Sequence, residues 1–135
     1  MIDFNYELDF SLDNPTTYKA WISTCVTDYE HTLGELNYIF CDDAYLLKLN
    51  IEYLDHDTLT DIISFDYTEG TVVSGDIFIS LERVKENAVS LDVTFKEELH
   101  RVMIHGVLHY LGFKDKSVSE KEIMRAQEDK CISIF

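Results

Sequence analysis

The sequence is poor in proline and glycine, and it has no long apolar run. One proline and five glycines among 135 residues form no linker, and no internal repeat is present, so a single domain spanning residues 1–135 is expected. No apolar stretch approaches the roughly 20 residues that a membrane-spanning helix needs. The first residues also lack the basic and apolar regions of a secretory signal. We therefore expect a cytoplasmic protein without a membrane partner.

Cysteine is also scarce. Cys25, Cys41 and Cys131 are an odd and widely spaced set, and no Cys-x-x-Cys pair occurs. This pattern argues against a disulfide framework and against a thiolate zinc site. We expect three reduced thiols that serve mainly as small buried side chains.

Basic residues are nearly missing from the first part of the chain. Residues 1–82 contain 2 basic and 17 acidic residues, whereas residues 83–135 contain 9 of each. The net charge of -15 argues against a broad nucleic-acid-binding surface, and no DNA partner is expected. A polyanionic substrate would be repelled by the first part and not by the second. We interpret the excess mainly as solubilising surface charge.

Apolar periodicity and capping residues predict an α+β domain, a small mixed four-stranded sheet covered by about five helices. The predicted strands are residues 2–8, 36–41, 61–67 and 75–80, the last two as antiparallel neighbours. Five helices are predicted. The first starts at Asn14-Pro15 and runs to about residue 29, the second runs from 42 or 43 to about 53, and the third follows a Ser80 cap and ends at about 89. The fourth begins near 95 after a Thr94-x-x-Glu97 capping box, and the fifth follows a Ser119-x-x-Glu122 capping box and ends at about 130.

Two histidines on the helix that begins near residue 95 indicate a metal site. His105 and His109 are four residues apart, so they lie one turn above each other on the same helix face. Gly112 can end this helix by taking a positive φ. The chain would then double back and bring Asp115 to the two imidazoles. Three protein ligands leave a tetrahedral zinc ion one position for water, which is typical of a catalytic site.

The spacing His-x-x-x-His-x-x-Gly-x-x-Asp is also that of the metzincin proteases. In those enzymes a glutamate follows the first histidine and acts as the general base. Here that position is Gly106. A peptidase of this class would therefore lack its base, and the small residue can instead permit close packing.

Several ordered blocks of the chain resemble one known family. The blocks are His-Gly-Val-Leu-His-Tyr-Leu-Gly-Phe at 105–113, Leu-Asn-x-x-Tyr at 49–53, Asp-x-x-Thr-Asp-Ile-Ile-Ser-Phe at 57–65 and Gly-Asp-Ile at 75–77. They resemble the YbeY family of metal-dependent endoribonucleases. The resemblance implies cleavage of single-stranded ribosomal RNA in maturation of the 16S 3′ end and in ribosome quality control. It also implies one Zn²⁺ per chain, and the ribosomal RNA and small ribosomal subunit or its proteins as partners.

The chain departs from the family pattern at two positions. Asp115 stands where the family has a third histidine, and a carboxylate widens the choice of metal toward Mn²⁺ or Fe²⁺. Leu54 stands where the family has an arginine implicated in RNA cleavage. Arg101, one helical turn before His105, could take over as a catalytic cation, or it could simply solvate its helix.

Other candidate site residues follow from the resemblance and from charge. The family match places Asp61 beside the metal, as a candidate general base or as a residue that orders a strand end. Ser64 is a candidate phosphate contact, with a plain strand position as the alternative. Lys114 and Lys116 flank the third ligand and could neutralise phosphate locally.

The site chemistry alone leaves two other functions open. One is a zinc hydrolase of a small ester or amide. The other is a non-catalytic ribosome-maturation factor, in which a metal ion ties the motif helix to the following loop and Leu54 marks a lost catalytic group.

Overall fold

The predicted strands form one mixed sheet in the order β1-β2-β4-β3. The computed structural model describes residues 1–54 and 59–135, with β1 at Ile2–Tyr6, β2 at Thr32–Cys41, β3 at Ile62–Asp66 and β4 at Val72–Ser80. β1, β2 and β4 are parallel, and β3 is antiparallel to β4 as the sequence predicts. β2 begins earlier than expected because a register shift between Leu33 and Leu36 interrupts the alternation while the strand continues.

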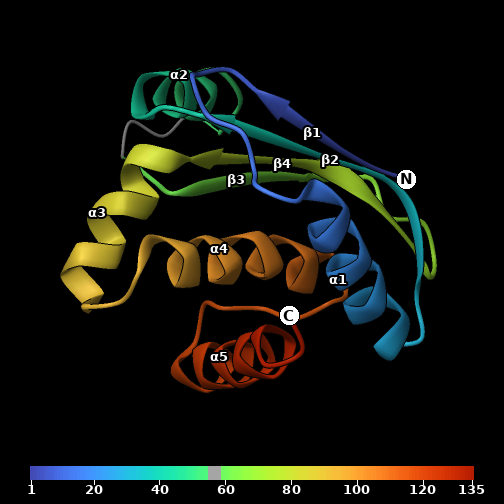
Figure 1. Ribbon diagram of the computed structural model, residues 1–135. Coiled ribbons are helices and arrows are strands. Elements are labelled where there is room, and N and C mark those ends of the chain that lie inside the picture. The colour runs from blue at the N-terminus through green and yellow to red at the C-terminus, as the bar shows by residue number, and fades with distance from the viewer. Residues whose placement is uncertain (55–58) are drawn as a thin grey trace.

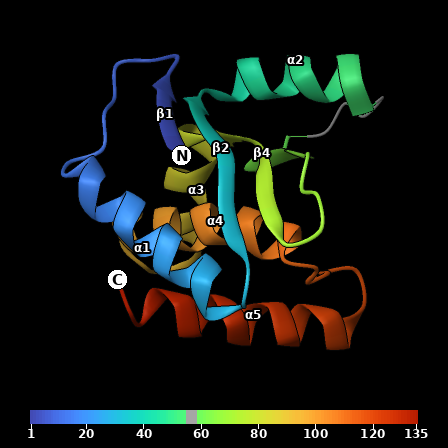
Figure 2. The same cartoon turned by 90° about the vertical axis from the view of Figure 1, so that its right-hand side faces the viewer.

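Five helices surround the sheet in layers (Figure 1). One face carries α2, and the other carries α1 and α4, with α5 packed on the far side of α4, an arrangement that Figure 2 shows from a second side. α3 connects the end of β4 to α4. The bounds are Pro15–Asp28 for α1, Asp43–Leu54 for α2, Leu81–Leu91 for α3, Phe95–Tyr110 for α4 and Val118–Ile132 for α5. The fold and the element order predicted from sequence are confirmed.

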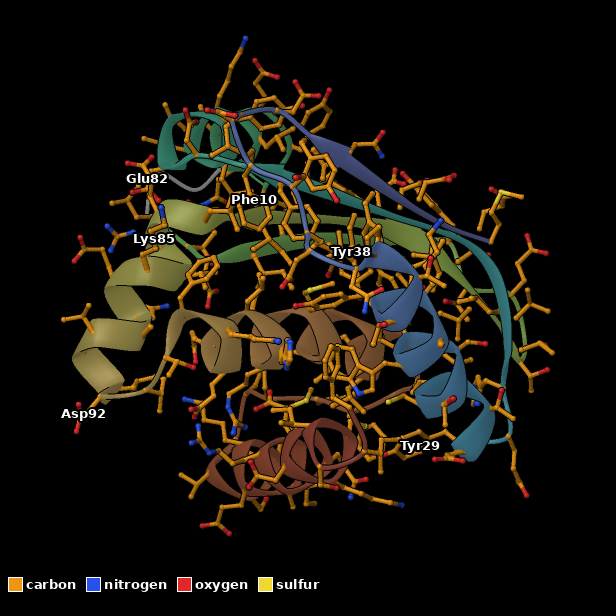
Figure 3. All side chains as sticks on the ribbon, in the orientation of Figure 1. Phe10, Tyr29, Tyr38, Glu82, Lys85 and Asp92 are labelled. Atoms are coloured by element: carbon orange, nitrogen blue, oxygen red, sulfur yellow. The ribbon has the colours of Figure 1, made fainter. Side chains whose placement is uncertain are left out.

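α4 is the central helix because the sheet covers one side of it and α5 the other. Tyr38 from β2 points into the layer between sheet and helices (Figure 3), where its hydroxyl donates to the carbonyl of Met103 over 2.8 Å. Gly106 lets α4 approach the sheet: a Cβ there would lie 2.9 Å from Cδ1 of Ile77 and 3.2 Å from Cδ1 of Ile62. A glutamate at this position, as in the metzincins, would require the end of the Ile77 side chain to move.

Two predicted caps are wrong in detail. The capping box of α5 uses Ser117 and Glu120, not Ser119 and Glu122. The sequence contains two overlapping Ser-x-x-Glu patterns, and the earlier one adds two residues to the helix. At α1 the helix begins at Pro15 as predicted, but Asn14 has a left-handed backbone (φ 60°) and its side chain makes no capping bond.

The three cysteines are buried and free, as predicted. Within the part of the chain that the structure describes, no helix has both the length and the apolar character needed to cross a membrane.

His100 on α4 gives the fold a specific sensitivity to acid. Its side chain is buried against Tyr18 and Phe135, and burial, together with the charge of Lys96, lowers its pKa to about 4. The unfolded chain therefore binds a proton near pH 6.5 that the folded chain binds only near pH 4. Above pH 6.5 we expect His100 to have no effect on the free energy of unfolding. Between pH 6.5 and pH 4 this residue should lower the free energy of unfolding by roughly 3 kcal/mol.

Urea unfolding of the native protein and the His100→Gln variant across this pH range checks the expectation. The carboxylates contribute equally to both proteins, so the difference between the two curves isolates His100. Parallel curves from pH 7 to pH 4 would show that His100 titrates normally.

Candidate metal centre

The C-terminal end of α4 shapes the proposed site. Gly112 has φ 104°, its N–H donates to the carbonyl of His109 over 3.0 Å, and the N–H of Phe113 donates to the carbonyl of Leu108 over 3.0 Å. These two bonds form a Schellman motif, which only a residue tolerant of positive φ completes easily. The chain then turns back along the helix and brings Asp115 to its histidines, as the sequence predicts.

The three predicted ligands converge. Nε2 of His105 lies 3.1 Å from Nε2 of His109, and Oδ2 of Asp115 lies 3.2 Å and 3.3 Å from these two nitrogens. Among the described residues, this is the one group of three or more metal-ligating side chains close enough to share an ion. The side chains are partly exposed, so the site is open to solvent.

These separations fit a small tetrahedral ion. Two ligands that are each about 2.0 Å from a tetrahedral zinc ion lie about 3.3 Å apart. Two imidazoles and one carboxylate form a donor set that suits zinc, manganese or iron. The donor chemistry and the spacing therefore fit a divalent transition metal, and three protein ligands leave a coordination position for water.

Glu128 on α5 fixes the orientation of His105. Its Oε2 accepts a hydrogen bond from Nδ1 of His105 over 2.6 Å, so in the neutral ring the lone pair lies on Nε2, on the side of Asp115 and His109. Its Oε1 accepts from Arg101 over 2.9 Å, and Arg101 also pairs with Asp129 over 2.8 Å. The sequence alone does not point to Glu128, because nothing in the local pattern of α5 distinguishes it from other helix carboxylates.

The electrostatics of His105 reflect these contacts. Burial alone would lower its pKa, but the hydrogen bond and charge of Glu128, with the charges of Asp115 and Asp61, raise it above the ordinary value. A bound cation would take the place of the proton that these three carboxylates favour.

The three predicted ligands lie in the wall of a cavity of about 470 Å³ between α4, α5 and the start of β3. Burial raises the pKa of Asp61 in this wall, although the charge of His105 opposes the shift. The amide of Asn87 donates to Oδ2 of Asp61 over 3.4 Å. The cavity is lined by Thr60, Asp61, Ile62, Ser64, Glu98, Arg101, Val102, His105, His109, Asp115 and Glu128.

Only some of the other predicted residues line the cavity. Ser64 and Arg101 belong to the cavity wall together with Asp61. Lys114 and Lys116 are exposed on the loop on either side of Asp115 and do not line the cavity. Leu54 is an exposed residue at the end of α2. The Asp57 part of the Asp-x-x-Thr-Asp block lies outside the described residues.

Comparison with known proteins gives a consistent match over the whole chain. The family model described as endoribonuclease YbeY matches residues 5–135. The chain is 58% identical to endoribonuclease YbeY of Flavobacterium johnsoniae over 100% of this chain and 97% of the relative, and 56% identical to that of Flavobacterium psychrophilum over 100% and 96%. The solution structure of TM1509 from Thermotoga maritima superposes with a TM-score of 0.68 at 26% identity, covering 97% of this chain and 89% of the other.

The matched residues include the two histidines, Gly112 and Asp115, so the geometry described above lies within the matched region. The family suggested by the sequence blocks is confirmed. This chain belongs to the endoribonuclease YbeY family.

Proposed function

We propose that this protein is a zinc-dependent endoribonuclease that cleaves single-stranded ribosomal RNA in maturation of the 16S 3′ end. The convergence of His105, His109 and Asp115 beside a cavity is the observation that carries the proposal. Relatives named endoribonuclease YbeY at 58% and 56% identity support the reaction class. We infer that it acts in the cytoplasm, where ribosomal RNA is matured.

When bound, the metal would supply a Lewis acid that polarises a phosphoryl oxygen and makes its bound water more acidic. Around it, Glu128 holds His105 in the tautomer that presents Nε2. We assign Asp61 the role of proton acceptor for the attacking water, because its carboxylate lines the same cavity and burial raises its pKa above the ordinary value.

Positive charge is limited at this site. Arg101 is the one cation among the described residues that line the cavity, and both of its terminal nitrogens are ion-paired to α5. We assign it a contact with a phosphate oxygen at the cavity edge, with Lys114 and Lys116 as outer phosphate contacts and Ser64 as a hydroxyl contact. Together, these phosphate contacts would replace the arginine that the family has at the position of Leu54.

The distribution of charge supports a partner-dependent substrate. The excess of acidic residues in 1–82 repels free RNA, so we propose that the small ribosomal subunit or one of its proteins delivers the strand. A carboxylate ligand leaves Mn²⁺ or Fe²⁺ as other possible native ions.

Cleavage of RNA by the metal-loaded protein tests the proposal. We expect zinc-loaded native protein to cut a single-stranded 16S 3′ precursor fragment, and His109→Ala to lower the rate by more than 100-fold because it removes one of three ligands. Gel analysis of end-labelled RNA measures the cuts. His31→Ala is a matched control, since His31 lies away from the cavity.

Each alternative function predicts a different result. Turnover of small esters or amides without RNA cleavage would favour the small-molecule hydrolase. Tight binding to ribosomal subunits without cleavage, unchanged in His109→Ala, would favour a non-catalytic maturation factor. Either result would contradict the endoribonuclease proposal.

A further inference from the structure

Glu98 is a buried carboxylate that the site described so far does not use. Glu98 is 6% exposed, and within residues 1–54 and 59–135 no hydrogen bond or ion pair engages its carboxylate, whose oxygens keep some exposure to the cavity. It lines the same cavity as the metal ligands. Burial and the charge of Asp61 raise its pKa, although the charges of Arg101 and Arg125 oppose the shift.

Glu98 lies on the same helix as the two histidines of the metal centre. It precedes His105 by seven residues, so it lies on the same face of α4, about 10 Å along the helix axis. The apolar side chains of Val102, on the same helix, and Ile62, on β3, line the cavity with it. A distance of this order separates a nucleotide's phosphate from the far edge of its base.

Arg101 and Arg125 lower the pKa of Glu98 through their charges, but neither forms an ion pair with it. Arg101 is committed to Glu128 and Asp129, and Arg125 is an exposed residue of α5 that forms no ion pair with Glu98 in this structure. A buried carboxylate without donors is costly, and a ligand with N–H groups would remove that cost.

We propose that Glu98 selects guanine in the nucleotide next to the cleaved phosphate. The inference rests on the proposed function, because it takes the metal centre as the phosphate site. Guanine presents two adjacent donors, N1–H and N2–H, to the two oxygens of one carboxylate. Adenine and cytosine place an acceptor beside their amino group, and uracil places a carbonyl on each side of N3–H, so each sets an acceptor against a carboxylate oxygen.

Val102 and Ile62 supply apolar walls against which the face of the base can pack. Recognition of the Watson–Crick edge requires an unpaired base, which agrees with a preference for single strands. A bidentate contact of this kind discriminates between bases by about 10-fold or more.

Nucleoside monophosphate binding tests the proposal without needing cleavage. Isothermal titration of the zinc-loaded protein with the 3′ and 5′ isomers of GMP, AMP, CMP and UMP measures base preference. We expect one GMP isomer to bind about 10-fold more tightly than UMP, and Glu98→Gln to reduce that ratio to threefold or less. Glu97→Gln is the matched control, since Glu97 is the exposed neighbour and does not line this cavity.

Equal affinity for GMP and UMP in the native protein would overturn the guanine site, as would a GMP preference that survives in Glu98→Gln. If the protein cleaves RNA but shows no preference for GMP, the endoribonuclease proposal stands and the guanine site falls. If it prefers GMP through Glu98 but does not cleave RNA, the guanine site stands and the endoribonuclease proposal falls. A melting temperature within a few degrees of native shows that Glu98→Gln is folded.

Discussion

Replacing Asp115 by alanine should reduce zinc affinity by more than 100-fold and abolish RNA cleavage with it. Oδ2 of Asp115 faces both histidine nitrogens at 3.2 Å and 3.3 Å, so the variant keeps two ligands where three are needed. Loss of an outer contact alone typically costs 10- to 100-fold in metal affinity, and loss of a direct ligand exceeds that. Elemental analysis of protein purified without chelator, followed by competition with a fluorescent zinc indicator, measures the loss.

Two further variants make this result specific. Asp115→His restores the ligand that the family pattern has and should retain one zinc per chain. It replaces a charged ligand by a neutral one, so the bound water should become more acidic. Lys116→Ala changes the neighbouring exposed residue and should leave zinc content unchanged. Full zinc occupancy in Asp115→Ala would remove this residue from the site.

Local sequence signals predicted the convergence of His105, His109 and Asp115 because every signal lies within one short stretch. The spacing of His105 and His109 requires only a helix, and Gly112 requires only the positive φ that it adopts here. The number of residues in the loop after Gly112 then brings Asp115 back to the histidines. Such features depend on backbone geometry within about ten residues and little on the rest of the fold.

The surroundings of the ligands depend on tertiary packing, and there the sequence was less informative. Glu128 and Glu98 belong to different helices and look like ordinary surface carboxylates in the sequence, yet burial between α4, α5 and the sheet gives each a distinct environment. The cap of α5 was misplaced for a related reason. Two overlapping capping patterns are equivalent locally, and the helix uses the earlier one.

Arg101 illustrates how a charge can be correctly located without its role being fixed. The sequence places it one turn before His105, and the structure places it in the cavity wall. Its side chain also links Glu128 to Asp129, so it supports the residue that orients His105. A substitution of Arg101 would therefore alter the metal centre and any phosphate contact together, which makes it a poor probe of catalysis.

Glu128→Gln is the sharper probe of how the metal ligands are held. We expect it to lower zinc affinity by about 10- to 100-fold, with cleavage recovering when zinc is added in excess. The glutamine can accept from only one atom, so it cannot serve His105 and Arg101 together as the two carboxylate oxygens do. Loss of the negative charge also makes His105 a weaker donor to the cation.

Asp129→Asn separates this effect from a general loosening of α5. Asp129 pairs with the same arginine, but its side chain is 59% exposed and it does not contact His105. A pair this exposed contributes about 1 kcal/mol or less, so the variant should keep native zinc affinity and nearly native stability. Equal losses of zinc affinity in the two variants would mean that the docking of α5, through Arg101, holds the site. A loss confined to Glu128→Gln would mean that the single hydrogen bond to Nδ1 sets the direction of His105 and hence the affinity of the centre.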